Sequence, residues 1–225
     1  RLMRLALCLR GHIRDGLFSD ALREFIVNCE KDGHSIDVYC HTWSESEAKT
    51  SYRALDRSHL FQVKEGLLRS YFKNCNVRDV RIENDSKIKI YGKKSGVVCK
   101  STCPLIAWKR MWAGQVAVVA EAYKNHKNYD AFINTRYDFF TAPICYTPPN
   151  HLKRIISRGE KFAFKYPTYS KSLIGVDNFY IGTPENMHAL VYDFYHDLDS
   201  IITKYPDIVH QEELVYRHAH DISLL

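Results

Sequence analysis

Several features that would place the chain in a membrane, secreted or disordered class are missing from its sequence. No run of about 18 apolar residues occurs, so we expect no segment that spans a membrane. Residues 1–4 lead directly into an apolar stretch and lack the small-residue cleavage pattern of a signal peptide. Internal repeats and low-complexity stretches are absent too, and the hydrophobic fraction of 45% is too high for a disordered chain.

The cysteines lack the pattern of a secreted disulfide framework. The chain has seven, an odd number at irregular spacing. Cys8 and Cys40 sit in apolar runs, as small core residues do. Cys99 and Cys103 are four apart with Cys75 upstream, which would suit part of a zinc site, but no second close pair completes it. We therefore predict seven free thiols and a reducing compartment such as the cytoplasm.

A basic arm is also missing, although the chain is basic overall. The net charge is +6, from 32 basic and 26 acidic residues that are mixed along the sequence. This balance favours anionic partners such as phosphates, and it does not favour nucleic acid. The length of 225 residues suits one large domain or two small ones. We expect a single domain over residues 1–225, and the ending without a polar tail suggests one domain of a longer protein.

The hydrophobic pattern predicts an α/β fold. Residues 5–9 form a short apolar run typical of a strand buried on both faces, residues 17–29 have helical spacing, and residues 36–40 read as a second strand. Strand, helix and strand within about 40 residues form a βαβ unit and hence a parallel sheet. Further strands are expected at 77–82, 131–134, 162–166 and 178–181, and helices at 104–126, 184–204 and 211–220. The prediction is a mostly parallel central sheet flanked by helices, with a smaller antiparallel addition.

Parallel sheets bind ligands at the carboxyl ends of their strands, so the loop that leaves the first strand at Leu9 is the first candidate site. Gly11 permits close backbone approach, and Arg10 and Arg14, on either side of His12, can grip phosphate oxygens. The alternative is a loop of solvated arginines. The loop is neither a GxGxxG nor a Walker pattern, which weakens the dehydrogenase and P-loop interpretations.

Two other strand ends carry candidate residues. Trp43 follows the second strand and can stack on a flat base, although capping the core is the commoner role. Arg136 and Asp138 follow the strand at 131–134. Asp138 is a suitable oxygen ligand for Mg²⁺ or Mn²⁺, and Arg136 can add positive charge or orient Asp138. The alternative is an Arg–Asp ion pair with no role in binding.

The second half of the chain offers two further carboxylates. Asp177 follows a Ser/Lys-rich stretch and could hydrogen-bond sugar hydroxyls or act as a base, but an Asp that forms a turn is equally common. Glu212 either joins the site or lies on a solvated helix face together with His218 and His220. Composition alone does not decide between these alternatives.

Five segments, in order, resemble the GT-A-like glycosyltransferase domains of bacterial polysaccharide loci and of large DNA viruses of the chlorella-virus type. They are residues 5–14 (LALCLRGHIR), 37–43 (DVYCHTW), 129–138 (YDAFINTRYD), 177–187 (DNFYIGTPENM) and 210–214 (HQEEL). Each motif alone is weak, and the order of five is more specific. The resemblance implies a GT-A-like, Rossmann-like fold and transfer of a sugar from a nucleotide diphosphate sugar, most often UDP-linked, to a glycan acceptor.

The resemblance also assigns roles to the candidate residues. The donor nucleotide would lie after the first two strands, against the segment Leu9–Arg14 and Trp43. Asp138 would bind Mn²⁺ or Mg²⁺ where GT-A enzymes carry an Asp-x-Asp motif, whose first acid is here Arg136. Asp177 or Glu212 would contact the sugar or deprotonate the acceptor.

If the protein is viral, its compartment would be the host cytoplasm. The alternatives are a nucleotidyltransferase and a non-enzymatic module that binds a nucleotide or carbohydrate.

Overall fold

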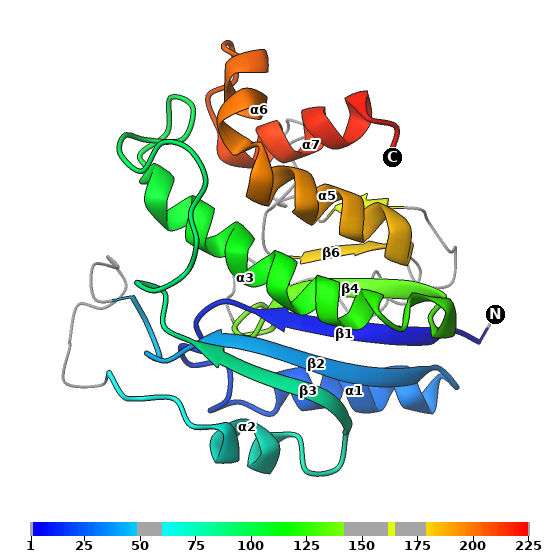
Figure 1. The fold of residues 1–225 in the computed structure, drawn as a ribbon. Coiled ribbons are helices and arrows are strands. Elements are labelled where there is room, and N and C mark those ends of the chain that lie inside the picture. Colours follow the sequence, from blue (N-terminus) through cyan, green and yellow to red (C-terminus); the bar gives the residue numbers. More distant parts are fainter. Residues whose placement is uncertain (1, 49–59, 142–161, 165–178, 225) are drawn as a thin grey trace.

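A computed structural model describes residues 2–48, 60–141, 162–164 and 179–224, and it confirms the predicted α/β class (Figure 1). One six-stranded sheet has the order β3-β2-β1-β4-β6-β5. The strands are β1 (Arg4–Arg10), β2 (Ser35–Trp43), β3 (Asn76–Glu83), β4 (Ala131–Arg136), β5 (Phe162–Phe164) and β6 (Phe179–Gly182). The first four strands in that order are parallel, and β6 runs antiparallel to both of its neighbours. This confirms the predicted mostly parallel sheet with a smaller antiparallel addition, which the structure places at β6.

Helices cover both faces of the sheet (Figure 1). The helices α1 (Ala21–Lys31) and α2 (Glu65–Tyr71) lie on one face, and α3 (Leu105–Tyr123) and α5 (Pro184–His196) lie on the other. The helices α6 (Leu198–Lys204) and α7 (Gln211–Asp221) extend the α3/α5 layer, and a short 3-10 turn, η2 (His126–Asn128), follows α3. Two hydrophobic cores result, one on each face of the sheet.

The central strand shows why its sequence is a continuous apolar run. Leu5, Leu7 and Leu9 point into the core under α1 and α2, while Ala6 and Cys8 point into the core under α3 and α5. A strand with period-two alternation and a helix layer on each side needs apolar residues at every position. Its small residues face α3, so that side of the strand leaves room for a closely packed helix.

Several predicted boundaries are wrong in detail. The first helix was predicted from Leu17 but begins at Ala21, because tight turns before it are closed by bonds from Gly16 N to Ile13 O and from Phe18 N to Asp15 O. The predicted helix over 184–204 is two helices that meet at Asp197. Thr183 caps the first of them, since its hydroxyl accepts from Asn186 N at 3.2 Å.

Two further findings concern membrane-spanning helices and the cysteines. Across the described ranges, no helix has both the length and the apolar character needed to cross a bilayer. Six of the seven cysteines are described, and these six are free thiols. Burial raises the pKa of both Cys29 and Cys40 to about 12, which makes their thiols poor nucleophiles. Cys145 lies outside the described residues, so the prediction of seven free thiols awaits a thiol titration.

Candidate functional site

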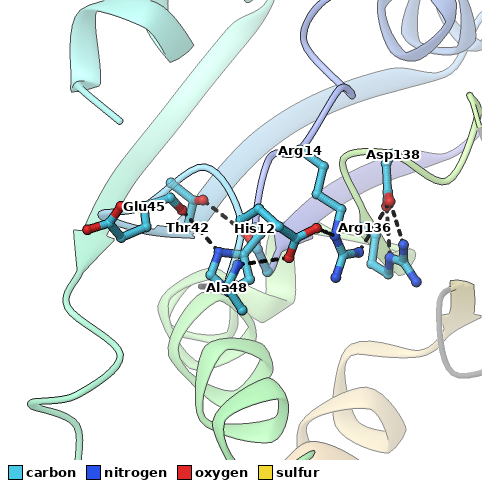
Figure 2. A network of polar contacts seen from close by, with 9 residues as sticks. His12, Arg14, Thr42, Glu45, Ala48, Arg136 and Asp138 are labelled. Atoms are coloured by element: carbon cyan, nitrogen blue, oxygen red, sulfur yellow. Dashed lines mark hydrogen bonds and ion pairs between the residues drawn. The ribbon is translucent and has the colours of Figure 1, made fainter. Parts of the chain in front are cut away.

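Three loops meet at the carboxyl edge of the sheet. The strands β1, β2 and β4 are parallel and in register, with Arg10 opposite Arg136 and Leu9 opposite Cys40. The chain therefore leaves all three strands at the same edge, as the sequence predicted. The residues that follow them, 11–20, 44–48 and 137–141, bring charged side chains together there (Figure 2).

We call Arg14, Glu47, Arg136 and Asp138 the edge cluster. Arg14 Nε lies 2.5 Å from Glu47 Oε2, and Arg14 Nη1 lies 3.2 Å from Asp138 Oδ2. Arg136 grips the same carboxylate with two N–H groups, Nε to Oδ1 at 2.8 Å and Nη2 to Oδ2 at 2.5 Å. Figure 2 shows the carboxylate of Asp138 pointing toward both guanidinium groups. One carboxylate thus holds two arginines from different loops.

The backbone of the first loop is shaped to present Arg14. Its φ is +47°, in the left-handed region that a residue with a Cβ adopts only at a cost, and such conformations concentrate at binding sites. Its N–H donates to Ser46 O at 2.9 Å, which ties the first loop to the second. At Gly16, an added Cβ would lie 2.5 Å from the carbonyl carbon of Tyr137. Only glycine therefore fits where the first loop crosses the backbone beside Asp138.

The electrostatics of the edge cluster keep Asp138 ionised. Burial alone would raise its pKa, but the positive charges and hydrogen bonds of Arg136 and Arg14 outweigh burial, so its pKa lies below the ordinary value. The side chain of Asp138 is only 5% exposed, whereas those of Arg14 and Arg136 are 24% and 14% exposed. The arginines therefore reach the surface of the cluster, and the carboxylate lies beneath them.

Arg10 lies under the edge and belongs to a second, buried polar chain. It is 1% exposed and donates from Nε to Asn134 Oδ1 at 3.1 Å. Asn134 in turn donates from Nδ2 to Gln115 Oε1 on α3 at 2.9 Å. Such burial suits a cation that shapes the floor of the site better than one that grips a phosphate at the surface. Sequence reasoning missed Asn134 and Gln115, since a lone amide inside an apolar strand or helix carries no recognisable motif.

Leu9, Gly11 and His12 are the other residues of this segment that were predicted to lie against the nucleotide. Leu9 is fully buried in the core under α1 and α2. Gly11 has a φ of +85°, and its carbonyl accepts from Thr42 Oγ1 at 2.9 Å. An added Cβ at Gly11 would meet no atom within 4 Å, so the backbone conformation, and not crowding, requires glycine here. His12 Nδ1 lies 3.0 Å from Glu45 O, and burial lowers its pKa, so its imidazole is neutral at pH 7.

Trp43 takes the core-capping position. It is 3% exposed, and its ring meets that of His41 edge-on, with a centroid distance of 4.8 Å. An added Cβ at Gly114 of α3 would lie 3.4 Å from Trp43 Cζ2 and 3.1 Å from His41 Nδ1. The helix therefore packs directly on this pair of rings, an arrangement closer to the core-capping alternative than to base stacking.

The residues around Asp138 do not fit a divalent metal. An ionised carboxylate offers about four acceptor positions, and three of those on Asp138 are taken by guanidinium N–H groups. A cation at this carboxylate would also sit beside two permanent positive charges. Within the described ranges, no group of three or more His, Cys, Asp or Glu side chains is placed to hold a metal ion. These contacts therefore do not support Mn²⁺ or Mg²⁺ at Asp138, and metal dependence of the protein remains a prediction.

Of the two carboxylates predicted in the second half of the chain, only Glu212 is among the described residues. Asp177 lies outside the described residues. Glu212 is half-buried in the first turn of α7, a helix whose Leu214 and Val215 belong to the core under α3 and α5. The roles predicted for both, contact with the sugar or removal of the acceptor proton, remain predictions.

An open groove of about 590 Å³ lies elsewhere, between β3, α3 and Tyr195 of α5. Its lining includes Ala113 and Ala117 of α3 and the charged residues Arg81 and Lys87. No residue of the edge cluster is among the described residues that line it. We place the candidate site at the edge cluster because three strand ends converge there.

Comparison with known proteins supplies no family for this chain: no family model matches it, and no curated protein matches it.

Proposed function

We propose that the chain transfers a sugar from a nucleotide diphosphate sugar to a glycan acceptor. The observation that carries the proposal is the edge cluster itself, in which Arg14 and Arg136 come from two loops and meet at the carboxyl edge of a parallel sheet. That edge is where open α/β sheets bind their ligands. Paired guanidinium groups are the side chains best suited to a diphosphate.

The transfer reaction sets what the site must do. The bond between the sugar C1 and the β-phosphate oxygen breaks, its electron pair goes to the leaving diphosphate, and the acceptor oxygen forms the new bond to C1. The acceptor proton passes to a base or to the departing phosphate. Stabilising the negative charge that develops on the diphosphate is the main task of the protein, and fixed positive charge at the phosphate does this. Asp177 and Glu212 remain the proposed contacts for the sugar or the acceptor.

The test is a panel of nucleotides and nucleotide sugars, measured by thermal shift and by donor hydrolysis. A bound ligand adds about 2.7 kcal/mol to the free energy of unfolding when its free concentration is a hundredfold above the dissociation constant, and this raises the melting temperature. We expect UDP and a UDP-sugar to stabilise the protein, and an acceptor to be glycosylated. Stabilisation without any turnover would instead support the non-enzymatic binding module. No response to any nucleotide would contradict the proposal.

A further inference from the structure

We infer that Arg14 and Arg136 bind the donor diphosphate directly, in the position that a metal ion holds in metal-dependent enzymes, and that Asp138 is their positioning residue. The inference rests on the proposed function only for the identity of the ligand. It follows from the disagreement between the metal expected at Asp138 and the side chains that surround that carboxylate.

The first step concerns what Asp138 is able to do. Both of its oxygens accept from guanidinium groups, and its side chain is 5% exposed. A metal ligand must offer a free lone pair toward the cation, and a charged side chain this deeply buried has to be paired. The carboxylate is paired with Arg14 and Arg136. Its contacts are those of a residue that holds arginines.

The second step concerns what the two arginines have left to offer. A guanidinium carries five N–H donors, and Arg14 uses two of them, toward Glu47 and Asp138. No other described residue accepts from its remaining three, and its side chain is 24% exposed. Arg14 and Arg136 both donate to Asp138 Oδ2, so their guanidinium groups are neighbours, and their like charges are offset by that carboxylate and, at Arg14, by Glu47. A diphosphate, with an anionic oxygen for each guanidinium, matches this pair.

The third step concerns the cost of building the site. Arg14 has a left-handed backbone, and Gly16 lets its loop lie directly on the backbone of residues 137 and 138. An ion pair as such does not need a left-handed backbone, since Lys109 and Asp199 form one from two ordinary helices. Strain of this kind is typical of loops that hold a ligand-binding group in place.

Glu47 provides a way to separate a direct arginine site from a metal site. Its Oε2 lies 2.5 Å from Arg14 Nε, and its Oε1 accepts from Ala48 N at 2.8 Å. In the inferred site, Glu47 competes with the diphosphate for Arg14. Glu47→Gln therefore lowers the competing charge and should tighten the binding of an anion. A metal site would respond in the opposite way or not at all, because the variant removes negative charge near the cation.

The experiment measures binding of UDP, UMP and inorganic pyrophosphate by calorimetry in EDTA, and binding of UDP again with Mn²⁺ in place of EDTA. We expect UDP and pyrophosphate to bind in EDTA, UMP to bind less well, and Mn²⁺ to add little. Arg14→Gln and Arg136→Gln should each weaken UDP binding about tenfold or more, the usual effect of removing a hydrogen bond to a charged group. Glu47→Gln should strengthen it.

The control is Arg69→Gln, which removes an arginine paired with Glu65 on the surface of α2 and should leave binding unchanged. Melting temperatures establish whether each variant is folded. If a glutamine variant is unfolded, Arg14→Lys or Arg136→Lys replaces it, since lysine keeps the positive charge but loses the forked guanidinium donors.

UDP binding that requires Mn²⁺ and ignores both arginine variants would overturn the inference and leave the proposed function intact. Pyrophosphate binding without any nucleotide binding would uphold the arginine site and contradict the proposed function. Absence of binding by all three ligands would contradict both.

Discussion

Two networks of cations and carboxylates in this protein use similar side chains and differ in what they leave unused. On α3, Lys109 is 4% exposed, and its Nζ lies 2.7 Å from Asp199 Oδ1 and 2.6 Å from Tyr91 O. Asp199 Oδ2 also accepts from Lys93 N at 2.7 Å, so one pair ties together α3, α6 and the segment around residue 91. We call this network the α3 staple.

The edge cluster has the opposite character. In the α3 staple the buried ammonium of Lys109 contacts one carboxylate and one backbone carbonyl, and that carboxylate also accepts from a backbone N–H. The network therefore holds neighbouring elements of the fold together. In the edge cluster two arginines share one buried carboxylate, and Arg14 keeps donors that no described residue accepts from. An ion pair by itself therefore does not distinguish a binding site from a structural contact. What sets the edge cluster apart from the α3 staple is the set of solvent-reaching donors that Arg14 keeps.

The largest expected effect is on catalysis, at the two arginines of the edge cluster. Removing either arginine of the edge cluster, by Arg14→Gln or Arg136→Gln, should lower donor turnover roughly 100- to 1000-fold, the range found when one preorganised donor to a developing anion is lost. The measurement is hydrolysis of, or transfer from, a UDP-sugar, with Arg69→Gln as the surface control. Turnover within a few-fold of wild type in both variants would mean that the edge cluster is no more functional than the α3 staple.

The reverse effect is expected in the α3 staple. Lys109→Met removes the partner of Asp199 and of Tyr91 O, and the loss of hydrogen bonds to a charged group costs about 2 kcal/mol of the free energy of unfolding. For a chain of this size that lowers the melting temperature by about 4 to 8 °C. The affinity for UDP, measured by calorimetry below the transition, should stay as in wild type. A loss of UDP affinity without a loss of stability would erase the distinction between the networks.

A smaller effect is expected at Gly16, where geometry alone supports the edge cluster. Gly16→Ala forces the first loop away from the carbonyl carbon of Tyr137, which lies 2.5 Å from the added Cβ, and overpacking of this kind costs about 1 to 3 kcal/mol. Because that loop carries Arg14, UDP affinity should fall together with the melting temperature. Gly66→Ala on α2 is the matched control, since its added Cβ would meet no atom within 4 Å. Gly16→Ala with normal UDP affinity would show that Arg14 is not positioned by this contact.

The smallest expected effect is on the acid limb of stability. The pKa of Asp138 lies below its ordinary value in the folded protein, so its ion pairs stabilise the fold fully above the unfolded pKa of about 3.9 and stop doing so as the pH falls through the folded value. Denaturant melts between pH 7 and pH 3 should therefore show a shallower loss of stability for Asp138→Asn than for wild type, with the variant less stable at pH 7. Parallel curves for the two proteins would contradict the pairing of Asp138 with its arginines.

Much of the candidate site follows from a simple rule applied to the sequence. The apolar runs at 5–9 and 131–134 predicted buried strands, and the residues after them, Arg14, Arg136 and Asp138, meet in the structure. The rule works because parallel strands all end at one edge, so residues far apart in the chain become neighbours once the strands pair. Glu47 was missed although it follows β2 in the same way, since the polar stretch after Trp43 offered no periodic pattern to single it out.

Hydrophobic periodicity predicted all six strands, the parallel sheet and which strand ends carry charge, because periodicity and strand direction are local properties that tertiary contacts only reinforce. The function of each charged group, in contrast, depends on contacts that form only in the folded protein. Arg10 and Arg14 look equivalent in the sequence, yet one is buried against Asn134 and the other reaches the surface beside Asp138. The difference arises from alternation along β1 and from the left-handed turn that follows it. These set the direction of each side chain relative to neighbours more than a hundred residues away, and such neighbours leave no trace in the local sequence.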